Sequence, residues 1–212
     1  MDIEAMRRGA EAPVQARRED LSAVAQDLAD AFAEDRHFDW FMRTDARRAE
    51  ARQRLFSFLI GEAFAAASID RPAAGGAAAV WMPFEWLGPT PMLEELRTLP
   101  LMMFITGLAR FSRLAALRQD MDDHHPMERS HAYLWFLGVT PAAQGHGIGS
   151  RLLKVGTDRL DAAAMPAYLE TGTERNVALY RRHGFQVISE HKARADAPTM
   201  WSMWREPASP EG

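Results

Sequence analysis

A glycine-rich turn between a predicted strand and a predicted helix carries the clearest chemical signal in the sequence. The nearly continuous apolar run over residues 132–139 is typical of a strand that is covered on both faces. A short loop, a glycine-rich run at residues 144–149 and a predicted helix that ends near Ala164 follow it. Glycines let the backbone approach an anion, and the N–H groups and dipole of a helix start attract negative charge. The segment therefore predicts a phosphate-binding loop.

Two other glycine-rich phosphate motifs fit this turn poorly. A Walker loop ends in Gly-Lys-Ser or Gly-Lys-Thr, whereas Gly149 and Ser150 are followed by Arg151. A dinucleotide fingerprint counted from Gly145 would need a glycine at Ser150, and it turns almost directly after its strand. Glycines that merely close a tight turn are a further alternative, but they leave Gln144 and the downstream pattern unexplained.

A second block of residues follows downstream. Residues 167–171 predict a short strand, and Thr173 is placed as the N-cap of a helix that ends at the Gly-Phe pair of residues 184–185. Asn176 and Tyr180 are four residues apart, so they share one face of that helix.

The two blocks together resemble the GNAT superfamily of N-acetyltransferases. Residues 144–149 are similar to its Q/R-x-x-G-x-G/A motif, and residues 169–185 are similar to its second signature, a strand followed by an N-x-x-x-Y helix and G-F. The resemblance covers about residues 131–190, and residues 168–176 are similar to puromycin N-acetyltransferase relatives. It implies an α/β fold with a mixed, mostly antiparallel sheet, splayed central strands and flanking helices. It also implies acetyl-CoA as co-substrate and an amine as acceptor.

The resemblance further implies which residues bind acetyl-CoA. Backbone groups of Leu137 and Val139 would pair with the pantetheine arm, and the Val139 N–H would polarise the thioester carbonyl. His146 stands where many members carry Arg or Lys, and Arg151 could compensate. The implied binding residues are Leu137, Val139, Gln144, Gly145, His146, Gly147, Ile148, Gly149, Ser150, Arg151, Asn176 and Tyr180.

Tyr180 and Glu170 are the candidate catalytic residues. By resemblance, the Tyr180 phenol would protonate the departing thiolate; the alternative is a ring that only fills the core. Glu170 ends the strand near the expected cleft and is a candidate general base. Other candidates that stay open are a water molecule and the side chains of His131, Glu85, Asp35 and Asp39.

Helical periodicity covers much of the first part of the chain. Apolar positions at three- and four-residue spacing predict helices over residues 18–33 and 46–66. Residues 92–118 predict two helical segments separated near Pro100, and residues 120–129 predict a polar loop.

Strands and aromatic residues complete the expected site. Strands are predicted at residues 66–69 and 77–82 around a Pro-Gly turn, and at 185–190 and 199–205 as antiparallel neighbours. A bulky acceptor would need aromatic walls. The aromatic candidates are Trp40, Phe41, Trp81, Phe84, Trp86 and Trp135.

Length and composition describe a globular chain. It has 212 residues, 47% of them hydrophobic, which is about 1.4 typical domains. We expect one N-acetyltransferase domain over residues 1–206, with an acetyl-CoA-binding core at 131–190 and a helical elaboration at 92–129. Residues 207–212 should form a flexible tail.

Charge and cysteine content exclude several classes of function. A net charge of −4 argues against a nucleic-acid partner. No cysteine is present, which excludes disulfides, thiolate metal sites and an acetyl-cysteine intermediate, so the amine should attack the thioester directly. Adjacent acidic and histidine residues at 122–125 lack the spacing of metal ligands, and no metal site is predicted.

The N-terminal residues have no apolar signal segment, and the longest apolar stretch, residues 99–109, is shorter than a membrane span. We therefore expect a cytoplasmic protein without a membrane partner; a homodimer is a family tendency. The expected function is direct acetyl transfer from acetyl-CoA to a primary amine of a small molecule. The alternative is a non-catalytic acyl-CoA-binding sensor or regulatory protein of the same fold.

Overall fold

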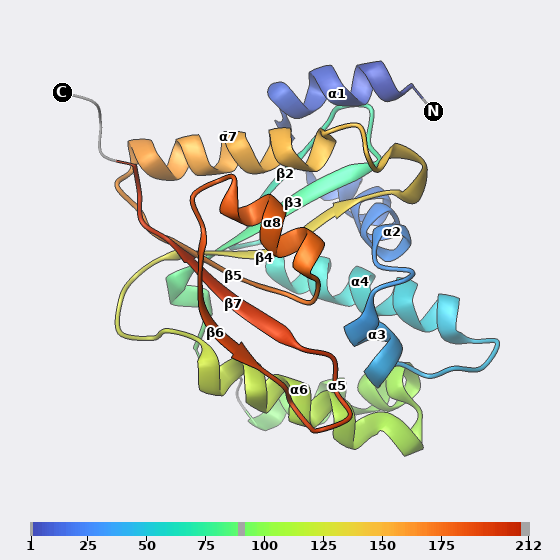
Figure 1. Cartoon of the computed structure of the whole chain (residues 1–212). Helices are drawn as coiled ribbons and strands as arrows, with labels where there is room; N and C mark the ends of the chain where they lie inside the picture. The colour runs from blue at the N-terminus through green and yellow to red at the C-terminus, as the bar shows by residue number, and fades with distance from the viewer. Residues whose placement is uncertain (1, 89–91, 209–212) are drawn as a thin grey trace.

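A computed structural model describes residues 2–88 and 92–208 of the chain (Figure 1). Seven strands form one sheet in the order β1-β2-β3-β4-β5-β7-β6. The strands are β1 (Val14–Gln15), β2 (Ser68–Arg71), β3 (Ala77–Pro83), β4 (Ala132–Val139), β5 (Ala167–Thr171), β6 (Gln186–His191) and β7 (Met200–Arg205). Only β4 and β5 pair in parallel, and every other neighbouring pair is antiparallel. The predicted mixed, mostly antiparallel sheet is therefore confirmed.

Helices cover both faces of this sheet. They are α1 (Ile3–Glu11), α2 (Leu21–Ala31), α3 (Arg36–Phe41), α4 (Arg48–Ala63), α5 (Met92–Thr106), α6 (Phe111–His124), α7 (Ile148–Ala162) and α8 (Glu174–Arg181). One core joins α1, α7 and α8 to one face of the sheet, and a second core joins α2 and α4 to the other. Burial of these apolar faces is the main force that holds the layers together.

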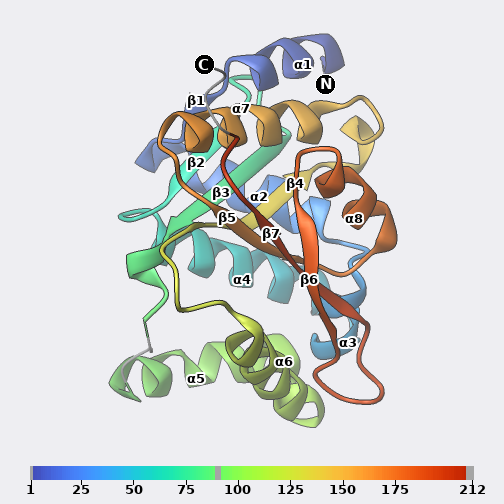
Figure 2. The same cartoon turned by 60° about the vertical axis from the view of Figure 1, so that its left-hand side comes forward.

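A third apolar core lies under α3, α5 and α6, where Trp40, Ile105 and Leu117 are buried together. In both views these helices lie at the end of the molecule opposite α1 and α7, as Figure 2 shows most clearly. Ala197 and Met200, from the β6–β7 connection and the start of β7, complete this core. The helical elaboration therefore packs against the sheet end formed by β6 and β7.

The predicted break near Pro100 is wrong, because α5 runs through that proline. The chain turns instead at Gly107, whose φ of +65° lies in the left-handed region that glycine adopts at little cost. The predicted loop at residues 120–129 is also wrong in its first part, since α6 continues to His124. The polar residues at the end of α6 face partly solvent and partly the sheet end, so the segment lacks the apolar periodicity by which a helix is recognised in the sequence.

Three short elements were not expected from the sequence. They are α1, whose Met6 and Ala10 are buried against α7, the two-residue strand β1, and α3, which lies between the two predicted helices at residues 18–33 and 46–66. No single helix among the described residues is long and apolar enough to span a membrane. The segments Leu96–Thr106 and Leu108–His124 reach that length only together, across a bend of 103°.

The end of the chain is partly fixed. Arg205 holds Asp161 of α7 through two hydrogen bonds of 2.7 and 2.6 Å, and the Ala208 N–H donates to the same carboxylate at 2.8 Å. Residues 207 and 208 of the predicted flexible tail are therefore placed beside α7. Residues 209–212 of that tail lie outside the described residues.

The packing of α7 on β3 gives a stability prediction. A Cβ at Gly156 would lie 2.6 Å from the Trp81 indole, which is 4% exposed and cannot swing into solvent. We expect Gly156→Ala to lower the free energy of unfolding by about 1–3 kcal/mol in urea denaturation, because overpacking outweighs the gain in helix propensity. Gly61→Ala in α4 is the matched control, because the added Cβ would have no other atom within 4 Å. It should be neutral or stabilising. Equal effects of the two substitutions would contradict the packing argument.

Candidate active site

The parallel strands β4 and β5 pair over only two residues each. Ala132 pairs with Ala167 and Tyr133 with Tyr168, and no further pairs follow. Beyond this point β4 stays with β3 up to Val139, while β5 stays with β7. The two central strands therefore diverge and leave a split in the middle of the sheet.

The β4 edge of this split presents backbone groups. The Thr140 N–H donates to the Gly76 carbonyl at 2.9 Å, so Thr140 and Gly138 direct their polar groups toward β3. Leu137 and Val139 alternate with them and so direct their N–H and C=O groups to the other side, where β5 has diverged. This is the orientation that pairing with an extended ligand requires.

The glycine-rich turn closes the wide end of the split. Gly145 and Gly147 have φ angles of +80° and +74°, and Gly147 is the N-cap of α7. The Gln144 side chain donates to the Val139 carbonyl at 3.0 Å, which ties the turn to the end of β4. As at any helix start, the N–H groups of Ile148, Gly149 and Ser150 have no acceptor within the helix. The turn therefore offers an anion several N–H donors.

Arg151 and His146 are engaged within the turn itself. The Arg151 guanidinium donates to the carbonyls of Gly147 and His146 at 3.1 and 3.4 Å, and its Nε donates to Glu11 of α1 at 2.7 Å. The His146 ring contacts the Gln144 carbonyl at 2.9 Å. Both side chains thus interact with carbonyl oxygens of the turn, and not with the side that carries its N–H groups.

Sequence reasoning missed His183, which contacts the other side of the turn. Its Nε2 lies 2.7 Å from the Ser150 hydroxyl, at the start of α7. Burial, with nearby Arg182, Arg205 and Lys154, lowers the pKa of His183. A neutral imidazole at this place orients the serine hydroxyl without adding a fixed charge.

Helix α8 begins at Glu174 as predicted but ends at Arg181, two residues before the predicted end at His183, and it carries Tyr180 on the face that packs on the sheet. The Thr173 hydroxyl accepts from the Asn176 N–H at 3.2 Å, and Gly184 has a φ of +86° just past the helix. Asn176 is exposed, whereas Tyr180 packs in the same core as Leu169 of β5. No described residue hydrogen-bonds the Tyr180 hydroxyl, and burial raises the pKa of this phenol well above its ordinary value. Tyr180 is thus a protonated donor without a protein acceptor.

Glu170 lies on the opposite face of the sheet. Along β5, Leu169 belongs to the core on the α7 and α8 side, so Glu170 and Tyr168 point to the other side. The Glu170 side chain is 4% exposed, and its Oε1 lies 3.8 Å from Nδ1 of His125. Glu170 also raises the pKa of the Tyr133 hydroxyl, after the larger effect of burial. Tyr180 and Glu170 therefore flank the split from its two faces.

A chain of buried polar groups fixes α6 to the sheet end. The Tyr168 hydroxyl donates to Ser202 at 2.9 Å, Ser202 contacts Nε2 of His191 at 3.0 Å, and Nδ1 of His191 contacts Asp120 at 2.8 Å. Ser202, His191 and Asp120 have the order of a Ser-His-Asp triad. However, Ser202 is fully buried, so a substrate cannot reach its hydroxyl. This chain is a structural network.

The same region does not fit a metal ion. Asp120, His124 and His191 bring possible ligand atoms within 4.8 Å of one another. However, the two imidazoles stack at 3.7 Å with an interplanar angle of 4°. A metal binds in the plane of each imidazole ring, and two parallel stacked planes do not share such a point.

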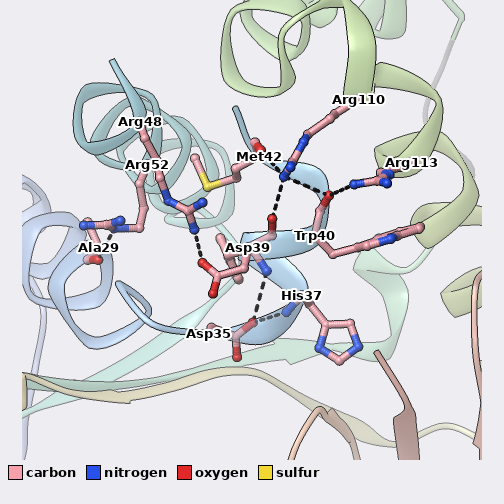
Figure 3. A network of polar contacts seen from close by, with 11 residues as sticks. Ala29, Asp35, His37, Asp39, Trp40, Met42, Arg48, Arg52, Arg110 and Arg113 are labelled. Atoms are coloured by element: carbon pink, nitrogen blue, oxygen red, sulfur yellow. Dashed lines mark hydrogen bonds and ion pairs between the residues drawn. The ribbon is translucent and has the colours of Figure 1, made fainter. Parts of the chain in front are cut away.

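Helix α3 forms a wall beside this network and is held by two arginines of the α5–α6 region (Figure 3). Arg110 donates to the carbonyls of Asp39 and Met42 at 2.7 and 3.0 Å, and Arg113 donates to that of Trp40 at 3.0 Å. These cations satisfy the free carbonyls at the C-terminal end of α3. His37 at the start of α3 points away from the arginines.

His37 is packed tightly against the end of β5. It is 6% exposed, and a Cβ on Gly172 would lie 2.4 Å from its Nδ1. Burial lowers the pKa of His37, and its Nε2 has no described hydrogen-bond partner. Only glycine leaves room for this ring beside the split.

Two of the alternative general bases have structural partners. Asp35 caps α3 by accepting from the His37 N–H at 2.9 Å, and Asp39 forms an ion pair with Arg48. Glu85 is exposed in a short turn after β3. His131 is 1% exposed and contacts His125, so it belongs to the group around Glu170.

The aromatic candidates separate into two sets. Trp40, Phe41 and Trp81 are buried in the cores and do not line an open surface. Phe84 packs on His131 with ring centroids 5.2 Å apart, and Trp86 packs on Trp135 at 5.1 Å. Trp135 is the extra residue of a β-bulge in β4, since Trp81 pairs with Leu134 and Val80 with Phe136.

Comparisons with known proteins agree with this geometry. The acetyltransferase (GNAT) family matches residues 105–185. A crystal structure of histone acetyltransferase HPA2 and related acetyltransferase from Corynebacterium glutamicum shares 26% sequence identity, with a TM-score of 0.67 over 94% of this chain and 98% of that one. Arylalkylamine N-acetyltransferase 2 from Aedes aegypti shares the fold, with 10% identity and a TM-score of 0.64 over 92% of this chain and 98% of that one.

The mycothiol acetyltransferase of Jonesia denitrificans is 39% identical over 61 residues, which are 27% of this chain. The matched segment spans only 19% of the length of that relative. This likeness therefore concerns one segment and not the whole relative.

Three imidazoles predict how stability depends on pH. Burial lowers the pKa values of His37, His131 and His183 below their ordinary value of 6.5. Below about pH 6.5 the unfolded chain then binds more protons at these sites than the folded chain does, so acid favours unfolding. We expect the free energy of unfolding, measured in urea, to fall between pH 7.5 and pH 5.5. His183→Gln should flatten this slope, and stability that rises on acidification would contradict the assignment.

Proposed function

Because the chain contains an acetyltransferase domain of the GNAT family, we propose that it transfers the acetyl group of acetyl-CoA directly to a primary amine of a small molecule. The observation that carries this proposal is the placement of Tyr180 and Glu170 on opposite faces of the split between β4 and β5. A proton donor on one face and a carboxylate on the other allow donor and acceptor to meet within the split.

The face of α7 and α8 fits acetyl-CoA. Leu137 and Val139 direct backbone groups into the split, and the start of α7 offers N–H donors for the pyrophosphate. Gln144 would hold the turn in place, and the Ser150 hydroxyl, oriented by His183, would add a further donor. Glycine at residues 145 and 147 keeps the left-handed backbone that exposes these groups.

The two faces divide the proton transfers between them. Glu170 would take the proton of the attacking amine as the nitrogen bonds to the thioester carbon. The Val139 N–H would stabilise the negative charge that develops on the carbonyl oxygen. The C–S bond then breaks, and the Tyr180 hydroxyl would give its proton to the sulfur. Since the sequence holds no cysteine, no acetyl-cysteine precedes this step.

The acceptor face supports a small amine. On the Glu170 side of the sheet, His131 contacts His125 and packs on Phe84, and the His37 ring lies against Gly172 at the end of β5. The chain shares its fold with an arylalkylamine N-acetyltransferase. This likeness is consistent with an acceptor in which the amine is attached to an apolar group.

The direct test is release of the CoA thiol from acetyl-CoA in the presence of amines, including arylalkylamines, polyamines, aminonucleosides and peptide N-termini. We expect turnover with at least one small amine and tight binding of acetyl-CoA by calorimetry. Binding without turnover across the panel would favour the sensor, and absence of binding would overturn the proposal. Faster turnover with peptides than with small amines would correct the acceptor class.

The role of Tyr180 gives a sharper prediction. We expect Tyr180→Phe to lower kcat by about 10²-fold or more, because the departing thiolate loses its proton donor. Its affinity for acetyl-CoA and its free energy of unfolding should stay close to those of the wild type, since no described residue uses the hydroxyl. The readouts are steady-state kinetics, calorimetry and urea denaturation. Unchanged kcat would assign the proton transfer to solvent.

A further inference from the structure

The carboxylate of Glu170 is buried with one oxygen that lacks a hydrogen-bond donor. Its Oε1 has no hydrogen-bond partner among the described residues, and the side chain is 4% exposed. A carboxylate away from water takes up a proton unless a positive charge lies close to it. A base at this place therefore needs a cationic neighbour.

His125 is placed to be this neighbour. It follows the last residue of α6, and its Nδ1 lies 3.8 Å from the Glu170 Oε1. The ring is packed between two tyrosines, with centroids 4.4 Å from Tyr168 and 5.0 Å from Tyr133. This packing fixes the direction in which the imidazole points.

His131 determines which nitrogen of His125 donates a hydrogen bond away from Glu170. The Arg129 carbonyl can only accept, so Nδ1 of His131, 2.8 Å away, carries a proton. Burial lowers the pKa of His131, which leaves its Nε2 as an acceptor near pH 7. Nε2 of His125 lies 2.9 Å from that atom and must therefore donate. With its proton on Nε2, a neutral His125 ring leaves Nδ1 unprotonated, and a second proton on Nδ1, the atom nearest the carboxylate, would make the ring an imidazolium.

We propose that His125 is a positioning residue for Glu170: His131 accepts the proton on Nε2 of His125 and so holds the ring with Nδ1 toward the carboxylate, and a second proton on Nδ1 gives the imidazolium that keeps Glu170 ionised. The inference rests on the proposed function, in which Glu170 accepts the proton of the amine.

Other titratable groups around His125 agree with a cationic ring. Burial raises the pKa of the Asp122 carboxyl in α6, and this group interacts electrostatically with Arg118 first and with His125 second. Tyr133 and Tyr168 stay neutral, because burial raises the pKa of both phenols far above the physiological range. The imidazolium thus lies between two carboxyl groups and two neutral rings.

The charge of His125 can be measured without turnover. In the full chain labelled with ¹⁵N-histidine, ring ¹H–¹⁵N correlation spectra at pH 7 should show His125 protonated on both nitrogens and His131 protonated on Nδ1 alone. The spectrum of His125→Gln assigns the signals. A neutral His125 ring at pH 7 would overturn the inference, and this result does not depend on whether the chain is an enzyme.

Kinetics test whether the charge acts on the base. His125→Gln keeps a donor for His131 but cannot carry the positive charge. We expect the acidic limb of the kcat/KM profile to move to higher pH by about one to three units, with acetyl-CoA affinity unchanged. Asp123→Asn, an exposed change in the last turn of α6, is the matched control and should keep the wild-type profile.

A lower rate with an unshifted acidic limb would reduce His125 to a packing role and contradict the proposal. If urea titrations show that the His125 variant is unfolded, the ring spectra of the wild type alone decide whether His125 is charged. If the wild type shows no turnover, the proposed function fails, and the ring spectra still test the ion pair.

Discussion

The restriction of β4–β5 pairing to two residues each is the constraint on which the rest of the structure depends. Parallel strands that stayed paired would use the backbone groups of Leu137 and Val139 within the sheet. Because β5 turns to β7 instead, these groups are directed into a split that runs through the sheet. One face of the sheet is covered by α7 and α8 and the other by α2 and α4, while His37 of α3 and His125 after α6 lie beside β5. In the proposed function, donor and acceptor approach the split from these two faces.

The layer formed by α3, α5 and α6 is held to the sheet by polar contacts as well as by apolar packing. Its arginines hold the carbonyl end of α3, and its acidic end joins His191 and Ser202 in a buried hydrogen-bonded chain. Such networks are stable only when their members are paired, because an unpaired buried polar group is costly. The packing of α6 thus fixes the positions of both walls around Glu170.

The local parts of the site could be predicted from sequence because their signals are local. Glycines at the start of α7 and the Thr173 cap with Tyr180 seven residues later each lie within one or two turns of helix. The contacts of His125 with Glu170 and of Ser150 with His183 join distant segments, and no spacing rule predicts them. Proline is a usual helix breaker, so the sequence predicts a break near Pro100, whereas α5 continues through it and the chain turns at Gly107, whose positive φ favours glycine.

The contacts of α6 with three different parts of the molecule have an evolutionary consequence. Residues along this one helix hold the α3 wall, anchor β6 and β7, and end beside the carboxylate of β5. A substitution on α6 that shifts these contacts will therefore also change the surroundings of Glu170. In the proposed function this couples acceptor preference to proton transfer, so mutations on α6 should show epistasis with those on β5.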